Sequence, residues 1–458
     1  MIGVIGGGIS GLLSALALER EGYDVILFEK DKLGGLCRSY RVDGYQVDTG
    51  VHAITMLNNG PLIRLLKKYS YYMPNFQPYG SYYIRENGLY EIPVSLDDWI
   101  TFPVIPKKDK ALIISKMIDL LTTGFEKNIS VYDVIKDLNL SDTTIKFFNT
   151  ICLFLSGENM KNTPLWRLFT GAGYIPEDDI LPFIYKENFK INPLKSSLIK
   201  KIHPDKLKTI LKNGFLKTIK DSSKKYLSKF ISGEKYSTQG YPLGGIQSIT
   251  NCIVNSLNKT KIVFEEVIRI EKESNKYIIT TTEDNYTVDK IIYSAPSKNL
   301  PDIAKIDEIK SIEDKLRSIK QSDSLTVWFS VDENKNPLKY KGSEIWINPP
   351  AWAKCISNYD KTLTKKGKSL IGVSFVRMKE KDAYEAINKY LNIDVESQDF
   401  LHIQRYIPEQ ASCHINQFFV YPKISDNFYV VGTDADPRSM GITRASFSVE
   451  VMLSEFLK

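Results

Sequence analysis

The sequence has little cysteine and no long apolar run. Its five cysteines are scattered, odd in number and contain no Cys-x-x-Cys pair. This pattern argues against a zinc site or a disulfide framework and favours a reducing cytoplasm. The apolar stretch at residues 12–18 is far too short to cross a bilayer, and the first five residues resemble a strand rather than a signal peptide. We therefore expect a cytoplasmic protein with no metal centre.

The chain also lacks a strong charge of one sign. Its 61 Lys and Arg residues against 54 Asp and Glu residues give a net charge of +7, which is too weak an excess to indicate a nucleic-acid partner. Hydrophobic residues at 43% and charged residues at 25% are ordinary for a globular protein, so extended disorder is not expected. A chain of 458 residues exceeds a typical single core and predicts two domains.

What the chain does contain is a glycine-rich turn inside a complete strand–helix–strand unit. The apolar run Ile2–Ile5 predicts a buried parallel strand. The run Gly6-Gly7-Gly8-Ile9-Ser10-Gly11 follows it, and a helical pattern continues to Gly22. A second apolar strand at residues 24–28 ends in Glu29. G-x-G-x-x-G at the turn, with an acid after the second strand, indicates a dinucleotide-binding βαβ unit.

Each residue of this motif has a physical role. Gly6 permits the tight turn, Gly8 lets the backbone approach a pyrophosphate, and Gly11 lets the helix lie close to the strand. Unpaired N–H groups at the helix N-terminus then attract the phosphates. Glu29 is placed to accept hydrogen bonds from both ribose hydroxyls and would repel a 2′-phosphate, which disfavours NADP.

The next segment indicates which dinucleotide binds. The run Lys32-Leu33-Gly34-Gly35-Leu36-Cys37-Arg38-Ser39 precedes Tyr45-Gln46-Val47-Asp48-Thr49-Gly50-Val51-His52. A G-G-x-x-x-[ST] run followed by D-x-G-x-H resembles the FAD-dependent amine oxidase, protoporphyrinogen oxidase and phytoene desaturase superfamily. The resemblance implies that Gly34, Gly35 and Arg38 lie along the FAD diphosphate and ribityl chain, where a cation suits the two negative charges of the pyrophosphate. His52 is either a cofactor contact or a structural histidine.

Two later segments also resemble the superfamily. Residues 239–246 contain a Y-P-x-G-G element that precedes a helix. Residues 262–270, 277–282 and 287–293 predict three strands, which in relatives complete the FAD-binding domain. In relatives the backbone at the position of Val267 pairs with adenine. Because the contact is made by the backbone, the resemblance assigns this role to the position and not to the valine side chain.

The C-terminal segment supplies a final landmark. An apolar strand is expected at residues 428–431 and a helix near Thr443. The resemblance implies that Gly432 lies beside the flavin and that the helix N-terminus points at the ring, where positive potential stabilises reduced flavin. It also implies that Asp434 or Asp436 contacts the ribityl hydroxyls, and Asp434 is our choice. No catalytic residue is assigned. The predicted cofactor-binding set is Gly6, Gly8, Ile9, Ser10, Gly11, Glu29, Lys30, Gly34, Gly35, Arg38, His52, Val267, Gly432, Asp434, Gly441 and Ile442.

These motifs predict an α/β fold, α+β overall. It contains a Rossmann-like FAD-binding domain of the glutathione-reductase type and an interleaved substrate domain of mixed sheet plus helices. The predicted FAD-binding domain is discontinuous and comprises residues 1–80, 232–305 and 405–458. The predicted substrate domain comprises residues 81–231 and 306–404, with a helical insert at about 108–230.

Three features of the predicted substrate domain each allow two interpretations. Aromatic residues are dense at 147–154 and 166–185, either as core packing or as a tunnel for a long hydrocarbon. Lys195–Phe230 holds eleven lysines beside an apolar stripe, either as a solvated face or as a peripheral contact with anionic lipid. Lys320 either lies near the flavin, as a lysine does in some amine oxidases, or on the surface.

We therefore expect a flavoenzyme that abstracts a hydride from a small apolar substrate. A phytoene desaturase-like enzyme acting on an isoprenoid or lipid is favoured, and an amine or protoporphyrinogen oxidase is second. Aromatic residues flanking the flavin would favour an amine substrate. A wide apolar tunnel would favour an isoprenoid substrate. Two other classes stay open: a mutase resembling UDP-galactopyranose mutase, which needs an arginine cluster, and a flavin-free prenyl carrier resembling Rab GDP-dissociation inhibitor.

Overall fold

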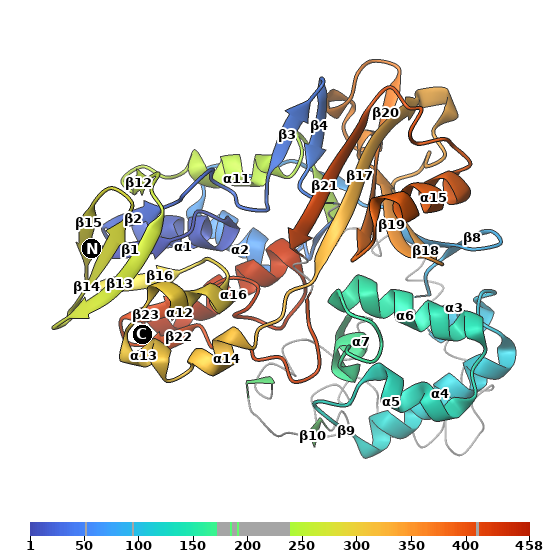
Figure 1. The fold of residues 1–458 in the computed structure, drawn as a ribbon, viewed down its shortest axis with the longest axis horizontal. Coiled ribbons are helices and arrows are strands. Elements are labelled where there is room, and N and C mark those ends of the chain that lie inside the picture. Colours follow the sequence, from blue (N-terminus) through green and yellow to red (C-terminus); the bar gives the residue numbers. More distant parts are fainter. Residues whose placement is uncertain (51–52, 94–95, 172–183, 186–189, 192–238, 409–411) are drawn as a thin grey trace.

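A six-stranded sheet forms the centre of the first half of the molecule (Figure 1). The computed structural model describes residues 1–458 except 51–52, 94–95, 172–183, 186–189, 192–238 and 409–411. Five strands of this sheet are parallel, and the edge strand β22 is antiparallel. Their spatial order is β12 (Lys261–Val263), β2 (Val25–Phe28), β1 (Ile2–Ile5), β16 (Lys290–Tyr293), β23 (Phe428–Val430) and β22 (Lys423–Ser425).

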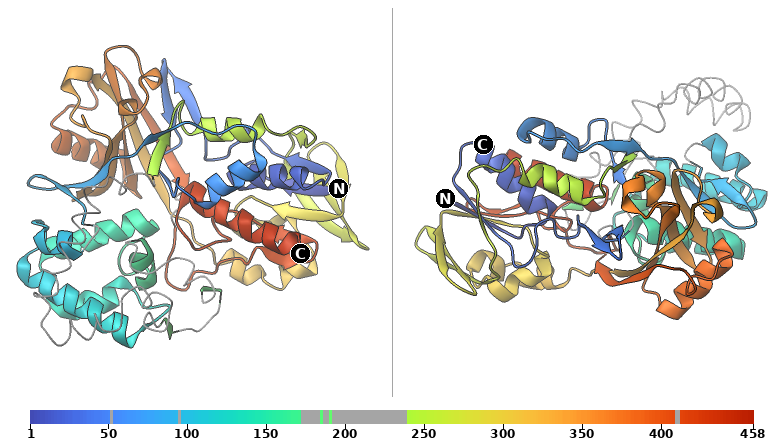
Figure 2. Two further views of the ribbon diagram at one scale, coloured as in Figure 1. Left: turned by 180° about the vertical axis from the view of Figure 1, so that it is seen from behind. Right: turned by 90° about the horizontal axis from the view of Figure 1, so that it is seen from above.

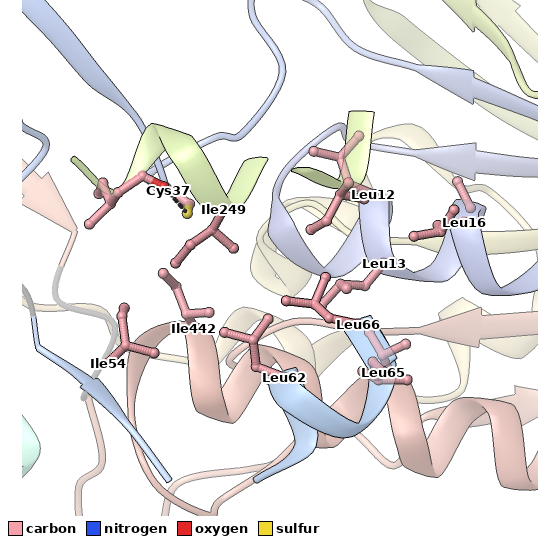
Figure 3. Packing of buried hydrophobic residues seen from close by; sticks show 14 of the residues in the cluster. Leu12, Leu13, Leu16, Cys37, Ile54, Leu62, Leu65, Leu66, Ile249 and Ile442 are labelled. Carbon is pink, nitrogen blue, oxygen red and sulfur yellow. Dashed lines mark hydrogen bonds between the residues drawn. The ribbon is translucent and has the colours of Figure 1, made fainter. Parts of the chain in front are cut away.

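Helices cover one face of this sheet because its central strands are apolar on both sides. Strands β1 and β2 are buried along their whole length, as expected for parallel strands covered on both faces. In Figure 3, Leu66 of α2 lies beside Leu13 of α1, and Leu62 lies beside Ile442 of α16. The helices of this layer are α1 (Ile9–Arg20), α2 (Pro61–Tyr69), α11 (Gln247–Val254) and α16 (Gly441–Phe456).

A small antiparallel sheet and short helices cover the opposite face. Tyr277, Ile279 and Val288 of the small sheet share a buried cluster with Ile5 and Phe28 of the parallel sheet. The elements of this layer are β13 (Val267–Glu273), β14 (Lys276–Thr281), β15 (Asn285–Val288), α12 (Leu300–Ile303), α13 (Asp307–Lys310) and α14 (Glu313–Arg317).

The sequence predicted three strands between residues 262 and 293, and two of these predictions are wrong because each covers two separate strands. Residues 262–270 divide into β12, which extends the parallel sheet, and β13, which begins the antiparallel one. Residues 287–293 divide in the same way into β15 and β16. The apolar pattern continues through both breaks because each half is covered by a different sheet, so periodicity alone cannot locate the change of direction.

A seven-stranded mixed sheet forms the other half of the molecule. All its neighbouring pairs are antiparallel except β18 with β7, and the hairpin predicted at Asn87-Gly88 joins β7 to β8. Alternate residues of β17 pack against α15 (Glu380–Leu391). The spatial order is β21 (Leu401–Pro408), β17 (Asp323–Asp332), β20 (Lys368–Val376), β19 (Pro350–Cys355), β18 (Gly342–Ile347), β7 (Ser81–Arg85) and β8 (Leu89–Glu91).

Short strands connect the two large sheets. The hairpin of β3 (Ser39–Val42) and β4 (Tyr45–Asp48) approaches the seven-stranded sheet (Figure 1). Strand β11 (Gln239–Pro242) lies between β5 (Ile54–Thr55) and β6 (Phe76–Pro78). Both chain termini lie at the end of the molecule that is remote from the seven-stranded sheet (Figure 2).

A helical cluster lies beside the seven-stranded sheet. Ser130 and Ser141 each accept a hydrogen bond from a backbone N–H at the start of the helix that follows, as N-cap residues do. Phe147, Phe148 and Trp166 lie in its buried core, in agreement with the core-packing interpretation for these residues. The cluster comprises α3 (Leu96–Thr101), α4 (Lys107–Thr123), α5 (Val131–Ile135), α6 (Asp142–Ser156), α7 (Leu165–Gly171) and the strand pair β9 (Phe125–Glu126) and β10 (Lys190–Ile191).

The lysine-rich segment Lys195–Phe230 lies outside the described residues, so its lipid contact stays a prediction, as does the division into domains by residue number. Within the described part of the chain, no helix is both long and apolar enough to cross a membrane.

Candidate dinucleotide site

The turn between β1 and α1 is built so tightly that two of its glycines are required by the protein itself. Gly6 has a φ of +101°, in the left-handed region that L side chains rarely adopt. A Cβ atom at Gly11 would lie 1.9 Å from the carbonyl oxygen of Gly6. Correct folding of this turn therefore requires glycine at both positions.

Gly8 in the same turn differs, because none of the described residues requires a glycine there. Its φ of −68° and ψ of 177° suit any residue, and within the described part of the chain a Cβ atom there would meet nothing within 4 Å. Gly8 is the N-cap of α1 and supplies no side-chain cap, so the first N–H groups of α1 are available to a ligand there. This open space at the helix N-terminus would suit a phosphate group.

Glu29 is held beside this turn by two backbone N–H groups. One carboxylate oxygen accepts a hydrogen bond from the N–H of Gly7 at 2.8 Å, and the other accepts one from Asp31 at 2.9 Å. The remaining lone pairs of the carboxylate can accept hydrogen bonds from a ribose. The neighbouring Lys30 forms an exposed ion pair with Glu266 at 3.1 Å.

The second glycine pair packs directly against the first turn. The N–H of Gly34 donates to the carbonyl of Gly7 at 2.7 Å, and a Cβ atom at Gly35 would lie 3.1 Å from the Cα atom of Gly8. Arg38 follows this pair and forms a partly exposed ion pair with Asp31 at 3.1 Å. Tertiary packing thus brings Gly34 and Gly35, which are predicted to lie along the diphosphate, against the first glycine turn.

The C-terminal segment returns to the same turn. Gly432 has a φ of +129°, and its ideal Cβ position lies 3.8 Å from the hydroxyl oxygen of Ser10. The N–H of Gly432 donates to Ser448 of α16 at 2.8 Å. Helix α16 begins at Gly441, two residues before the predicted start near Thr443. The Thr443 hydroxyl lies 2.8 Å from that of Thr55 and does not cap the helix.

Two aspartates on this segment have different partners. Both carboxylate oxygens of the fully buried Asp436 accept hydrogen bonds from the guanidinium of Arg438, at 3.0 and 2.8 Å. Asp434 is half-buried and accepts a hydrogen bond from the N–H of Ser297 at 3.0 Å. Burial raises the pKa of both carboxyls. Asp434 is thus the more accessible of the two to a ligand.

The D-x-G and Y-P-x-G-G elements interlock through a buried carboxylate. Asp48 accepts hydrogen bonds from the hydroxyls of Ser39 and Tyr241, both at 2.6 Å, and from the N–H of Ile246 at 3.2 Å. Val267, the predicted adenine position, begins β13, opposite Thr281 and next to a bulge.

The remaining predicted positions lie outside the described residues, on the surface, or in the first turns of two helices. His52 lies outside the described residues, and Lys320 is exposed, in agreement with the surface interpretation of that lysine. Ile9, Ser10 and Ile442 lie in the first turns of α1 and α16.

A buried lysine was missed by sequence reasoning. Lys354 of β19 is fully buried, and its Nζ atom lies 4.0, 4.7 and 4.8 Å from the ring centroids of Tyr241, Tyr79 and Tyr359. Burial lowers the pKa of Lys354 to about 7, and the negative charge of Asp48 opposes this shift. The available signal was a single lysine in an otherwise apolar strand, where a cation is costly unless it is compensated.

Comparisons with known proteins agree with this architecture. Residues 4–69 match the family model of the NAD(P)-binding Rossmann-like domain. The chain is 66% identical over 98 residues to an uncharacterized protein in the nifH2 3′ region of Methanothermococcus thermolithotrophicus, covering 21% of this chain and 96% of that protein. It is 24% identical over 349 residues to the 1-hydroxycarotenoid 3,4-desaturase of a Flavobacterium species, covering 72% and 63% of the two chains.

Solved structures share the fold over nearly the full length. An oxidoreductase from Methanosarcina mazei has a TM-score of 0.69 at 16% identity, covering 99% of both chains. A putative protoporphyrinogen oxidase from an Exiguobacterium species has a TM-score of 0.64 at 13% identity, covering 100% and 99%. A putrescine oxidase bound to putrescine has a TM-score of 0.63 at 12% identity, covering 99% and 97%.

The fold and the site define a protein with a Rossmann-type dinucleotide-binding unit beside a second part built on a mixed seven-stranded sheet. The chain thus carries an NAD(P)-binding Rossmann-like domain at residues 4–69, and over its whole length it is similar in fold to solved structures that include a putative protoporphyrinogen oxidase and a putrescine oxidase.

Proposed function

We propose that this protein is an FAD-dependent oxidoreductase that dehydrogenates an apolar isoprenoid or lipid substrate. The observation that carries the cofactor assignment is the space at Gly8. The described residues leave room for a side chain at this position, whereas glycine suits the close approach of a pyrophosphate to the N-terminus of α1.

Residues at both ends of the site suit FAD. Glu29 would hold the adenosine ribose, and Gly8, Gly34 and Gly35 would lie along the diphosphate. At the other end Gly432 and the N-terminus of α16 would face the ring system, where the helix dipole favours negative charge. Bound FAD would supply the acceptor for a hydride, and the protein would orient the substrate and exclude water.

The isoprenoid proposal is supported by relatives rather than by a visible substrate. The 1-hydroxycarotenoid 3,4-desaturase is named for a carotenoid and aligns with 72% of this chain. A hydride that leaves an allylic carbon needs no prominent acid or base, because the resulting cation is delocalised. The absence of an assigned catalytic residue is compatible with that chemistry.

An amine substrate is the second candidate, and one observation favours it. Tyr82, Phe154 and Trp352 are half-buried and contact one another, with ring centroids 5.5 and 6.0 Å apart along the series. They come from the seven-stranded sheet and from α6. If the amine binds against these rings, they would attract its positive charge through cation–π contacts.

Anaerobic titration tests the proposal. Purified protein would be mixed with polyenes, amines or porphyrinogens while the flavin absorbance is recorded. Bleaching by polyenes alone supports the isoprenoid assignment, and bleaching by amines replaces it with the second candidate. A colourless protein that binds no added FAD refutes the cofactor assignment and indicates a carrier instead.

A further inference from the structure

Gln404 is a buried side chain of the seven-stranded sheet that contacts the backbone of the D-x-G element. Its Oε1 atom accepts a hydrogen bond from the N–H of Gly50 at 2.9 Å. Its Nε2 atom donates to the carbonyl of Asp48 and to the hydroxyl of Tyr40, both at 2.8 Å. The acceptor and both donors of the amide are thus engaged, which fixes its orientation.

The side-chain amide of Gln404 makes the hydrogen bonds that a backbone peptide group of a neighbouring strand would make. Gly50 and Asp48 are two residues apart, so the amide binds an N–H and a C=O of the same segment, as a neighbouring strand does in a ladder. Gly50 has a φ of +79°, a conformation in which a regular strand cannot continue. The side chain therefore satisfies two backbone groups that the turn leaves without strand partners.

The segment held in this way contacts the loop that carries Arg38, which is predicted to lie along the diphosphate. The N–H of Thr49, between the two anchored residues, donates to the carbonyl of Arg38 at 2.9 Å. A displacement of the Asp48–Gly50 backbone would therefore disturb the backbone at Arg38.

We propose that Gln404 is a positioning residue that fixes the Asp48–Gly50 backbone against the cofactor and couples the seven-stranded sheet to it. This proposal rests on the proposed function, because it takes the bound cofactor to be FAD. Gln404 lies opposite Thr326 in the sheet, and Thr326 lies opposite Ser374, which in turn lies opposite Trp352. Gln404 thus lies in the same row across the sheet as Trp352.

Gln404→Glu tests the proposal, because the two protonation states of the new side chain differ in what they can bind. A protonated carboxyl accepts from Gly50 and donates to the Asp48 carbonyl, whereas a carboxylate can only accept and faces that carbonyl with a negative charge. We expect FAD affinity about tenfold weaker than in the wild type at pH 8. The affinity should return toward the wild-type value at pH 5, with a parallel shift in the visible circular dichroism of the bound flavin.

Gln398→Glu is the matched control. The Gln398 amide also donates to a backbone carbonyl, that of Asp394 at 2.7 Å, but this contact is exposed and lies before β21. The control should bind FAD like the wild type at both pH values. Gln404→Met, which removes the hydrogen bonds without adding charge, should weaken FAD binding at both pH values and supplies the test if the Glu variant does not fold.

The outcomes separate the two proposals. A wild-type protein that binds no FAD refutes the proposed function. A wild type that binds FAD, together with Gln404 variants whose affinity and flavin spectra match it at both pH values, overturns the role of Gln404 alone. An equal loss of affinity at pH 5 and pH 8 in Gln404→Glu, together with wild-type affinity in Gln404→Met, also overturns it, because the loss would then come from the added charge and not from the missing hydrogen bonds.

Discussion

Replacing Gly8 with alanine separates a glycine kept for a ligand from glycines kept for folding. In the apo protein the new methyl group enters open space at an ordinary backbone conformation. The free energy of unfolding of the apo protein should therefore change by less than about 0.5 kcal/mol or rise by up to about 1 kcal/mol, since alanine also restricts the unfolded chain. With a pyrophosphate in that space, the methyl group would overlap the ligand.

The expected loss of affinity follows from the cost of overpacking. An extra methyl group in a close contact costs about 1–3 kcal/mol, which corresponds to roughly 5- to 150-fold weaker FAD binding. Gly11→Ala should behave oppositely, because its Cβ atom would lie 1.9 Å from the Gly6 carbonyl oxygen. That contact forces α1 away from β1 and should destabilise the apo protein by at least about 1–3 kcal/mol.

Both quantities can be measured on flavin-free protein. Urea denaturation would give the unfolding free energy of each variant, and titration with FAD, followed by flavin fluorescence, would give the affinity. The argument fails if Gly8→Ala destabilises the apo protein as much as Gly11→Ala does. It fails equally if Gly8→Ala binds FAD as tightly as the wild type.

Three further predictions concern charge. Glu29→Lys should weaken FAD binding at least tenfold in the same titration while the protein stays folded, because it removes the ribose acceptor; unchanged affinity would contradict this role. Burial lowers the pKa of Lys354 to about 7, so the unfolded state binds more protons between pH 7 and pH 10. The wild type should therefore gain a few kcal/mol of stability over that range relative to Lys354→Met in urea denaturation, and parallel pH profiles would show that the lysine is not desolvated. If Lys195–Phe230 contacts anionic lipid, sedimentation with anionic liposomes should be salt-sensitive and absent with neutral ones; equal partitioning onto both would exclude it.

Local sequence determined the strand–turn–helix–strand unit at the start of the chain. The strand, turn, helix, strand and acid are contiguous within about 30 residues, and each has its own signature of periodicity or glycine spacing. Residues 2–29 therefore fold as their pattern predicts. The C-terminal strand and the Y-P-x-G-G element before α11 were also predictable, because each is a short local motif.

Tertiary structure alone decided how these pieces meet. The contact between Gln404 and Gly50 spans 354 residues, so no spacing in the sequence indicates it. The break at residues 264–266 depends on which sheet covers each half of an apolar run. The difference between Asp434 and Asp436 depends on Arg438 folding back on one of them. Periodicity encodes which side of an element is apolar, but only packing determines which distant group lies opposite, and the chemistry of this site depends on those distant pairs.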